Sequence, residues 1–259
     1  MTSVHAAFRD ETILAALERS GWVRAKEVAA RLGVSAVTIR SDLQRLEQAG
    51  LLRRTRGGAV VVAGRRLELP LEATRRMHSA EKARIGRYAA GLVSDGQTVI
   101  LDVGSTATEL ARALPLTVRD VIIVTSALNI ALMLESHPGV KVVVTGGTLR
   151  VLQHSLVNPF GTLLLEHLNA HLAFLGCNGI HPERGITNAN LEEAEIKRAM
   201  IRCAANTVVL ADHSKLMEVA TAPIVPIGQI GQLITGEEAS PEHIAALEAA
   251  GMSGRIALV

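Results

Sequence analysis

Five groups of glycines and polar residues each come directly after a short apolar run of the chain. The first follows QTVILDV and contains a Gly-Ser-Thr turn that leads into a helical segment. Backbone N–H groups at the start of a helix, together with hydroxyls and the helix dipole, can bind a phosphate. One such turn is more often an ordinary helix cap, but five groups that include a Lys and an Arg favour an anionic ligand. The candidate ligand-binding residues are Asp102, Gly104, Ser105, Thr106, Thr125, Ser126, Asn129, Gly146, Gly147, Arg150, Asn178, Gly179 and Lys215.

A second set of candidate residues lies in the helical segment AVTIRSDLQRLEQAG near the N-terminus. Ser35 is placed to cap this helix, which we expect to end at Gly50. Ile39, Leu43 and Leu46 are spaced at i, i+4 and i+7 and are predicted to pack inward. The opposite face carries small and hydrogen-bonding residues, which suit an approach to base edges in the major groove of DNA. The candidate DNA-binding residues of the cap and helix are Ser35, Val37, Thr38, Arg40, Ser41, Gln44 and Arg45.

The segments around this helix predict a winged helix-turn-helix. An apolar stripe predicts a helix over 10–20, and AKEVAARLG predicts a second helix that Gly33 ends. Two helices joined by a tight turn with Gly form the helix-turn-helix pattern. LLRRTRGGAVVV then predicts a hairpin whose Gly pair makes the turn, with Arg53, Arg54 and Arg56 placed to contact phosphates or the minor groove. The alternative is a small structural three-helix unit with a solvated basic face.

Charge is distributed unequally along the chain. Residues 1–76 carry 14 Lys and Arg against 8 Asp and Glu, whereas residues 77–259 carry 13 against 17. A basic N-terminal quarter suits a module that binds a polyanion. The N-terminus lacks the pattern of a signal peptide, and no apolar run approaches the ~18 residues of a membrane span. Because the only cysteines, Cys177 and Cys203, lack metal-like spacing, we expect a reduced, cytoplasmic protein without metal or cofactor.

Beyond residue 80, apolar runs of four to six residues alternate with helical segments. This alternation predicts an α/β fold with a parallel sheet and helices on both faces, in which ligands bind at the carboxyl ends of the strands. One helix is predicted to follow Pro70 and to continue to about residue 93. The predicted domains are a winged helix-turn-helix over 1–62, a linker with the start of a connecting helix over 63–80, and an α/β domain over 81–259.

The stretch TIRSDLQRLEQAGLLRRTRGGAV resembles the DNA-binding signature of the DeoR family of bacterial transcription regulators, although that family usually has a second Arg where Ser41 stands. Residues 77–259 resemble its sensor domain, which is Rossmann-like and similar in fold to phosphosugar isomerases. DVGSTATEL looks like the phosphate loop of ribose-5-phosphate isomerase, Thr125-Ser126 like its second contact, and ADHSK like its Lys-bearing segment. The resemblance implies a repressor of a carbohydrate-utilisation operon that binds operator DNA as a dimer or tetramer and responds to a sugar phosphate.

The comparison with the isomerases predicts binding without turnover. Proton transfer between adjacent sugar carbons needs a positioned general base. The isomerases have a DGADE-like turn and a Gly-rich KGGG segment, whereas this chain has LGCNGI and TNANLEEAEIKR. We expect a solvated or interface role for Glu192, Glu193 and Glu195, and structural roles for His154, His171, His181 and His213.

Two alternatives to a ligand-responsive regulator remain at this point. The first is a sugar-phosphate isomerase with a fused DNA-binding head, which turnover of pentose or hexose phosphates would support. The second is a constitutive DNA-binding protein whose body only forms oligomers, which a failure to bind any sugar phosphate would support.

Overall fold

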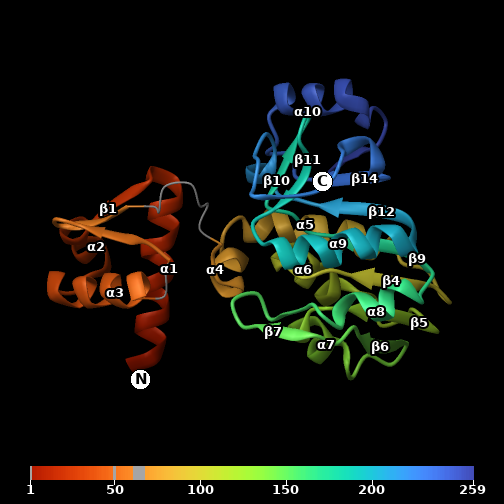
Figure 1. The fold of residues 1–259 in the computed structure, drawn as a ribbon, viewed down its shortest axis with the longest axis horizontal. Helices are drawn as coiled ribbons and strands as arrows, with labels where there is room; N and C mark the ends of the chain where they lie inside the picture. The colour runs from red at the N-terminus through yellow and green to blue at the C-terminus, as the bar shows by residue number, and fades with distance from the viewer. Residues whose placement is uncertain (1, 49–50, 61–67) are drawn as a thin grey trace. The chain divides into compact units, whose positions relative to one another are not determined.

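The computed structural model describes residues 2–48, 51–60 and 68–259. The chain forms two compact units, Met1–Leu69 and Pro70–Val259 (Figure 1). Part of the predicted linker lies outside the described residues, as does the expected end of the third helix at Gly50. Within the described residues, no helix combines the length and the apolar character that crossing a bilayer requires.

The first unit contains three helices and a three-stranded antiparallel sheet of order β1-β3-β2. The side chains of Ile13, Leu14, Leu17, Ile39 and Leu43 are buried in its core. The apolar stripes predicted for the first and third helices are therefore buried, as their spacing indicated. The elements are α1 (Thr2–Ser20), β1 (Trp22–Arg24), α2 (Ala25–Leu32), α3 (Ala36–Gln48), β2 (Arg53–Thr55) and β3 (Gly58–Val60).

Glycines define the turns of this unit. Gly33 ends α2 in the left-handed conformation, with φ of 64°, as the sequence predicted. In the hairpin, Gly57 has φ of 100° and forms the turn with Arg56, whereas Gly58 already belongs to β3. A Cβ at Gly58 would lie 1.8 Å from the carbonyl oxygen of Val23 on β1. Gly58 is therefore required by the close approach of two strands, and β1 is too short for the sequence pattern to have predicted.

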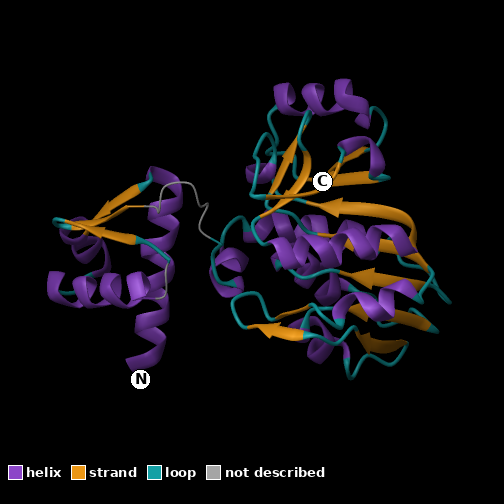
Figure 2. Cartoon of the chain, in the orientation of Figure 1, coloured by secondary structure: helices purple, strands orange, loops and turns teal. Residues whose placement is uncertain are grey.

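The second unit is built on a seven-stranded parallel sheet, whose strands run side by side in Figure 2. Its order is β15-β14-β12-β9-β4-β5-β6, so the direction in which strands are added reverses between β4 and β9. The predicted parallel sheet is confirmed, and the C-terminal β15 is a strand that the sequence pattern did not predict. The strands are β4 (Thr98–Leu101), β5 (Val121–Thr125), β6 (Val140–Val144), β9 (Ala170–Leu175), β12 (Ala204–Leu210), β14 (Gln232–Thr235) and β15 (Ile256–Leu258).

Helices cover both faces of this sheet. On β4, Val99 and Leu101 pack with α5 and α6, whereas Ile100 between them packs with Ile196 and Met200 of α9. This alternation is the two-residue period of a strand that is buried on both sides. The helices are α4 (Leu71–Arg76), α5 (Ser79–Ala90), α6 (Ser105–Ala113), α7 (Leu128–Leu134), α8 (Gly161–Glu166), α9 (Leu191–Cys203) and α10 (Pro241–Leu247), with short helical turns η1 (His213–Lys215), η2 (Ile227–Gln229) and η3 (Glu248–Met252).

Two small sheets complete the second unit. β7 (Thr148–Arg150) and β8 (Ser155–Val157) form an antiparallel hairpin after β6. β10 (Gly179–His181), β11 (Gly185–Asn188) and β13 (Ala222–Val225) form a second antiparallel sheet. The sequence pattern did not predict strands in these short segments.

The prediction of one continuous helix from Pro70 to about residue 93 is wrong. α4 ends at Arg76, and α5 begins at Ser79. Met77 is extended, and His78 is left-handed with φ of 52°, so neither residue continues a helix. The Lys82 ammonium donates a 2.6 Å hydrogen bond to the Thr74 carbonyl oxygen near the end of α4, which helps to satisfy a terminal carbonyl at the break.

Candidate functional site

Helix α3 presents the predicted DNA-facing residues to solvent. Ile39, Leu43 and Leu46 are buried, which confirms the predicted inward face. The Oγ of Ser35 accepts a 3.1 Å hydrogen bond from the Thr38 backbone N–H, which is the geometry of a helix N-cap. Val37 is 71% exposed. Arg40, Ser41 and Gln44 are exposed on the same side of the helix, and Thr38 is half-buried.

Arg45 differs from its neighbours because its guanidinium has intramolecular partners. Its two Nη atoms lie 2.5 and 2.6 Å from the carboxylate oxygens of Asp10, and Nη2 lies 3.2 Å from Oδ1 of Asp42. The hydrogen bond to Asp10 raises the pKa of Arg45 above its ordinary value. Asp42 is buried and also accepts hydrogen bonds of 2.6 and 3.0 Å from Arg9. Arg45 therefore helps to tie α3 to α1, a role that its place on the helix surface did not predict.

The hairpin after α3 exposes the three predicted wing arginines. Arg53, Arg54 and Arg56 are all exposed. The Arg54 backbone N–H donates a 2.7 Å hydrogen bond to Oε1 of Glu47, near the end of α3. Glu47 thus holds the base of the β2–β3 hairpin against α3, so the hairpin and α3 form one surface of the first unit.

In the second unit, the parallel sheet brings the ends of its strands to one edge. Asp102 follows β4, Thr125 ends β5, Gly146 follows β6 after one residue, and Asp212 follows β12 after one residue. Asn178 and Gly179 come shortly after β9, and Gly179 begins β10. The five polar groups therefore lie on the carboxyl edge that the strand–helix alternation predicted.

The Gly-Ser-Thr turn has a backbone that only glycine readily adopts. Gly104 has φ of 131° and ψ of 163°, and Ser105 is the first residue of α6. Ser105 and Thr106 are buried, and no side chain caps α6. Thr108 donates a 2.8 Å hydrogen bond to the Gly104 carbonyl oxygen. The turn thus directs uncapped N–H groups of α6 toward the strand edge, which is the arrangement that binds phosphate groups.

A buried ion pair lies where the strand order reverses. Lys197 of α9 forms a hydrogen bond and ion pair with Oδ2 of Asp102, and it also donates to the Gly176 carbonyl oxygen at 3.1 Å. The Gly176 backbone N–H donates to the same Oδ2 at 2.9 Å. Burial raises the pKa of Asp102, and the Lys197 charge opposes that rise. Lys197 is a functional candidate that the sequence did not reveal, because 95 residues separate it from its partner.

Glu193 is the centre of a second buried network within the chain, so the prediction of a solvated or interface role is wrong for this residue. Its Oε1 accepts hydrogen bonds from the Arg150 guanidinium and, at 2.6 Å, from Ser155. Its Oε2 accepts from Nδ2 of Asn188 at 3.2 Å. The Asn190 side chain caps α9 and directs Glu193 inward. Arg150 therefore has an intramolecular partner, whereas Glu192 and Glu195 are exposed as expected.

Several other predicted ligand residues also have structural contacts. Oγ1 of Thr125 accepts from the Ala127 N–H at 3.0 Å, and Oδ1 of Asn178 accepts from the Ala189 N–H at 2.8 Å. Gly147 has φ of 122°, and a Cβ there would lie 2.0 Å from the Val157 carbonyl oxygen. Lys215, in η1, is half-buried. These contacts fix the loops without excluding a ligand from their remaining donors.

Three buried polar atoms at the ends of β4 and β5 lack a hydrogen-bond partner among the described residues. They are Oδ1 of Asp102, Oγ of Ser126 and Oδ1 of Asn129. Asn129 is positioned by its own Nδ2, which donates a 3.0 Å hydrogen bond to Oγ1 of Thr108. Because an unpaired buried polar group is costly, the three atoms indicate that water or a polar ligand completes this edge.

Cys177 and the remaining candidate histidines do not form a catalytic arrangement within the described residues. Burial raises the pKa of the Cys177 thiol, after β9, to about 12. His171 and His181 each accept a backbone hydrogen bond through Nδ1, at 2.9 and 3.2 Å. His154 lies 2.9 Å from Oε1 of Glu72. These histidines have the structural contacts that the sequence interpretation assigned to them.

Comparison with known proteins agrees with this two-part organisation. Residues 9–64 match the DeoR-like helix-turn-helix domain, and residues 77–237 match the DeoR C terminal sensor domain. The chain is 32% identical over 249 residues to the HTH-type transcriptional regulator GolR of Listeria innocua, with 96% of this chain and 98% of that protein covered. It is also 32% identical to the putative aga operon transcriptional repressor of Escherichia coli O157:H7, with 94% and 91% covered.

The solved structures similar to this chain include an enzyme. Ribose 5-phosphate isomerase A from Methanocaldococcus jannaschii aligns with 53% of this chain and 54% of its own, at a TM-score of 0.40 and 19% identity. The curated relatives, by contrast, cover nearly the whole chain and are named as transcriptional regulators. The chain is therefore a DNA-binding transcriptional regulator, not an enzyme, and it belongs to the DeoR family.

Proposed function

We propose that this regulator represses a carbohydrate-utilisation operon and that a sugar phosphate, bound at the carboxyl edge of the large sheet, controls its affinity for operator DNA. The observation that carries the proposal is the group of unpaired buried oxygens of Asp102, Ser126 and Asn129 beside the uncapped start of α6. Hydroxyl groups of a sugar can pair with such oxygens, while the α6 N–H groups favour a phosphate.

The residues of the edge have different roles under this proposal. Gly104, Ser105 and Thr106 would bind the phosphate, helped by the Lys215 ammonium. Ser126 and Asn129 would hydrogen-bond the sugar, and Asp102 would do so through Oδ1 while Lys197 holds Oδ2. Thr125, Gly146, Gly147, Asn178 and Gly179 would shape the loops around the ligand. Arg150 would act through its pairing with Glu193, which positions the β7–β8 hairpin.

The DNA-binding part of the proposal assigns residues 1–62 to the operator and 63–80 to the connection. Val37, Thr38, Arg40, Ser41 and Gln44 would face the major groove from α3, with Ser35 at its start. Arg53, Arg54 and Arg56 would contact phosphates or the minor groove from the hairpin. Arg45 would act mainly through α1, since Asp10 and Asp42 already engage its guanidinium.

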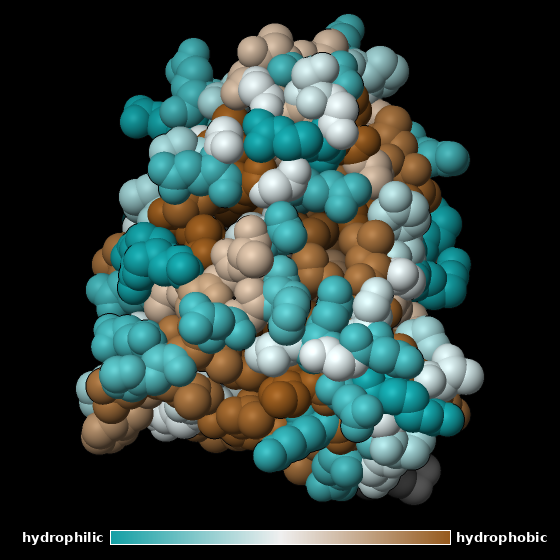
Figure 3. Space-filling model, turned by 90° about the vertical axis from the view of Figure 1, so that its right-hand side faces the viewer, coloured by the Kyte–Doolittle hydropathy of each residue, from teal (hydrophilic) through white to brown (hydrophobic). Residues whose placement is uncertain are grey.

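We also propose that residues 81–259 form a cytoplasmic dimer or tetramer. Large apolar side chains are exposed on the second unit, among them Leu132, Val151 and Phe160 at 67%, 75% and 61%. On the face drawn in Figure 3, apolar surface lies between polar groups. Two heads acting together would give useful operator affinity, because each head makes only modest contacts.

The test is fluorescence anisotropy of labelled DNA from upstream of the gene, with the wild-type protein and a panel of sugar phosphates. We expect at least one compound to change the DNA affinity by about 5–150-fold, a typical allosteric coupling. Ser105→Ala should keep the DNA affinity and lose most of this response. Ser94→Ala, at an exposed position outside the edge, is the matched control.

Two results would contradict the proposal. If no compound binds or changes DNA affinity, a constitutive DNA-binding role is favoured. If Ser105→Ala responds like wild type, the ligand lies elsewhere. A ligand can shift DNA affinity only by the difference between its affinities for the two states of the protein, so binding and DNA affinity must be measured together.

A further inference from the structure

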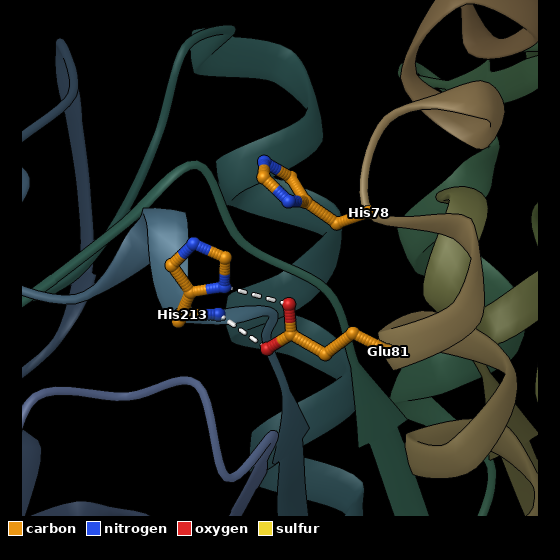
Figure 4. A group of neighbouring side chains, drawn as sticks. All are labelled: His78, Glu81 and His213. Atoms are coloured by element: carbon orange, nitrogen blue, oxygen red, sulfur yellow. Dashed lines mark hydrogen bonds and ion pairs between the residues drawn. The ribbon is translucent and has the colours of Figure 1, made fainter.

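Two histidines and a glutamate meet in the second unit, outside the proposed ligand residues. His78 and Glu81 flank the start of α5, and His213 begins η1 after β12. One potential ligand atom from each residue lies within 4.8 Å of the others. Figure 4 shows both imidazoles on the same side of the Glu81 carboxylate, and their ring centroids are 4.6 Å apart.

Glu81 is held rigidly in this cluster. Its side chain is 2% exposed, and its Oε1 accepts hydrogen bonds from the backbone N–H groups of His213 at 2.7 Å and Gly236 at 3.2 Å. Oε2 lies 2.7 Å from Nδ1 of His213 and faces the two rings. One oxygen thus anchors the carboxylate, while the other remains available in a fixed direction. Outer contacts of this kind orient the ligands of metal sites.

We propose that His78, Glu81 and His213 bind a divalent transition metal ion, with Zn²⁺ as the best fit. Two imidazoles and one carboxylate form a ligand set that Zn²⁺ accepts, with at least one position left for water or an anionic oxygen. Ligand atoms about 2.0–2.2 Å from one tetrahedral ion lie about 3.3–3.6 Å apart, so the ligand atoms, now within 4.8 Å of one another, must come closer by a rotation of a side chain. The exposed His78 side chain can make it.

Nearby charges are compatible with a cation at this position. The Lys82 ammonium, next to Glu81 in sequence, lies 3.5 Å from Oδ2 of Asp212. It also donates to the Thr74 carbonyl oxygen, so it points toward its own partners. The ion would replace the hydrogen bond between Glu81 and His213 with two metal–ligand bonds, and the imidazole hydrogen would reside on the other ring nitrogen.

The position of the cluster gives the metal a regulatory consequence. His78 lies at the break between α4 and α5, and His213 is two residues from Lys215, a candidate phosphate contact. A bound ion would therefore fix the start of α5 to the η1 loop. Metal binding itself does not depend on the proposed sugar-phosphate function and can be tested separately.

The experiment uses the untagged full-length protein, made metal-free, and titrates Zn²⁺ in competition with a chromogenic chelator. We expect one tight equivalent in the wild type and its loss in His78→Ala and His213→Ala. His154→Ala is the matched control, because it removes a histidine that also contacts a glutamate, Glu72, at 2.9 Å. It should bind Zn²⁺ like wild type.

Two further measurements distinguish metal binding at this cluster from misfolding of the variants and from metal binding by the cysteines. Zn²⁺ should raise the thermal midpoint of the wild type but not that of His78→Ala, whose own midpoint should fall only slightly, since the side chain is exposed but Ala is disfavoured at φ of 52°. The Co²⁺-loaded protein should show visible bands of nitrogen and oxygen ligation without the near-ultraviolet band of a thiolate. Equal Zn²⁺ binding by wild type and His78→Ala, no tight binding at all, or a thiolate band would overturn the proposal.

Discussion

Lys197 and Asp102 form an ion pair in which both side chains are buried, with 3% and 1% of their surfaces exposed. We predict that Lys197→Met lowers the free energy of unfolding by about 3–5 kcal/mol, because it leaves a buried carboxylate without its cation. Urea denaturation of the purified protein measures this loss. The control is Lys141→Met at an exposed position of β6, and a loss no larger than the control's would show that the pair contributes little.

The same variant should have an altered pH dependence. Burial already raises the pKa of Asp102, and Lys197→Met removes the charge that opposes this rise. In the folded variant, Asp102 therefore binds a proton at a pH at which the same carboxyl of the unfolded chain, with a pKa of about 3.9, is still ionised. Its stability should therefore increase relative to wild type as the pH falls from 7 toward 4. Denaturation curves at several pH values should show that the difference in free energy of unfolding between wild type and Lys197→Met narrows. A constant difference would contradict the pairing of Lys197 with Asp102.

Arg40 on α3 should contribute to operator binding. Arg40 is exposed, so Arg40→Ala should weaken operator binding by about 1–3 kcal/mol if the side chain reads a base. Its thermal stability and its ligand binding should not change. Arg112→Ala, exposed on α6, is the control in the same anisotropy assay. Unchanged operator affinity in Arg40→Ala would remove this residue from the DNA-binding surface.

Asp42 should be important for the stability of the first unit. Its carboxylate accepts hydrogen bonds from Arg9 and Arg45 and is almost fully buried. We predict that Asp42→Asn lowers the free energy of unfolding by about 1–3 kcal/mol, the usual contribution of hydrogen bonds to charged groups. Glu27→Gln is the control, since Glu27 pairs with Arg24 at 3.1 Å on the exposed surface. Equal effects of the two changes would mean that burial adds nothing at Asp42.

Gly104 should be sensitive to substitution for a reason of backbone geometry alone. A Cβ at this position meets no atom within 4 Å, but φ of 131° is unfavourable for any residue with a side chain. Gly104→Ala should therefore cost about 1–3 kcal/mol of stability or reshape the turn, and it should weaken the response to ligand. Gly228→Ala is the matched control, because its Cβ also meets no atom and its φ is ordinary. A wild-type response in Gly104→Ala would show that the turn tolerates another conformation.

The sequence predicted those features that depend on local periodicity. The spacing of Ile39, Leu43 and Leu46 was enough to define the inner face of α3, because a helix repeats every 3.6 residues. The alternation of apolar runs with helical segments was enough to place Asp102 and Thr125 at one edge of a parallel sheet. The unpredicted features depend on distant partners or on very short elements. Glu193 looks like a surface residue until Ser155 and Arg150 are folded against it, and β1 has only three residues.

The half-buried position of Cys177 has a consequence for the reactivity of its thiol toward oxidants. This thiol lies at the end of β9 against an apolar cluster, and its raised pKa keeps it protonated at neutral pH. Because the thiolate is the reactive form, oxidants, alkylating agents and disulfides should react with it slowly. We therefore expect no redox response from the Cys177 thiol beside the proposed ligand-binding edge.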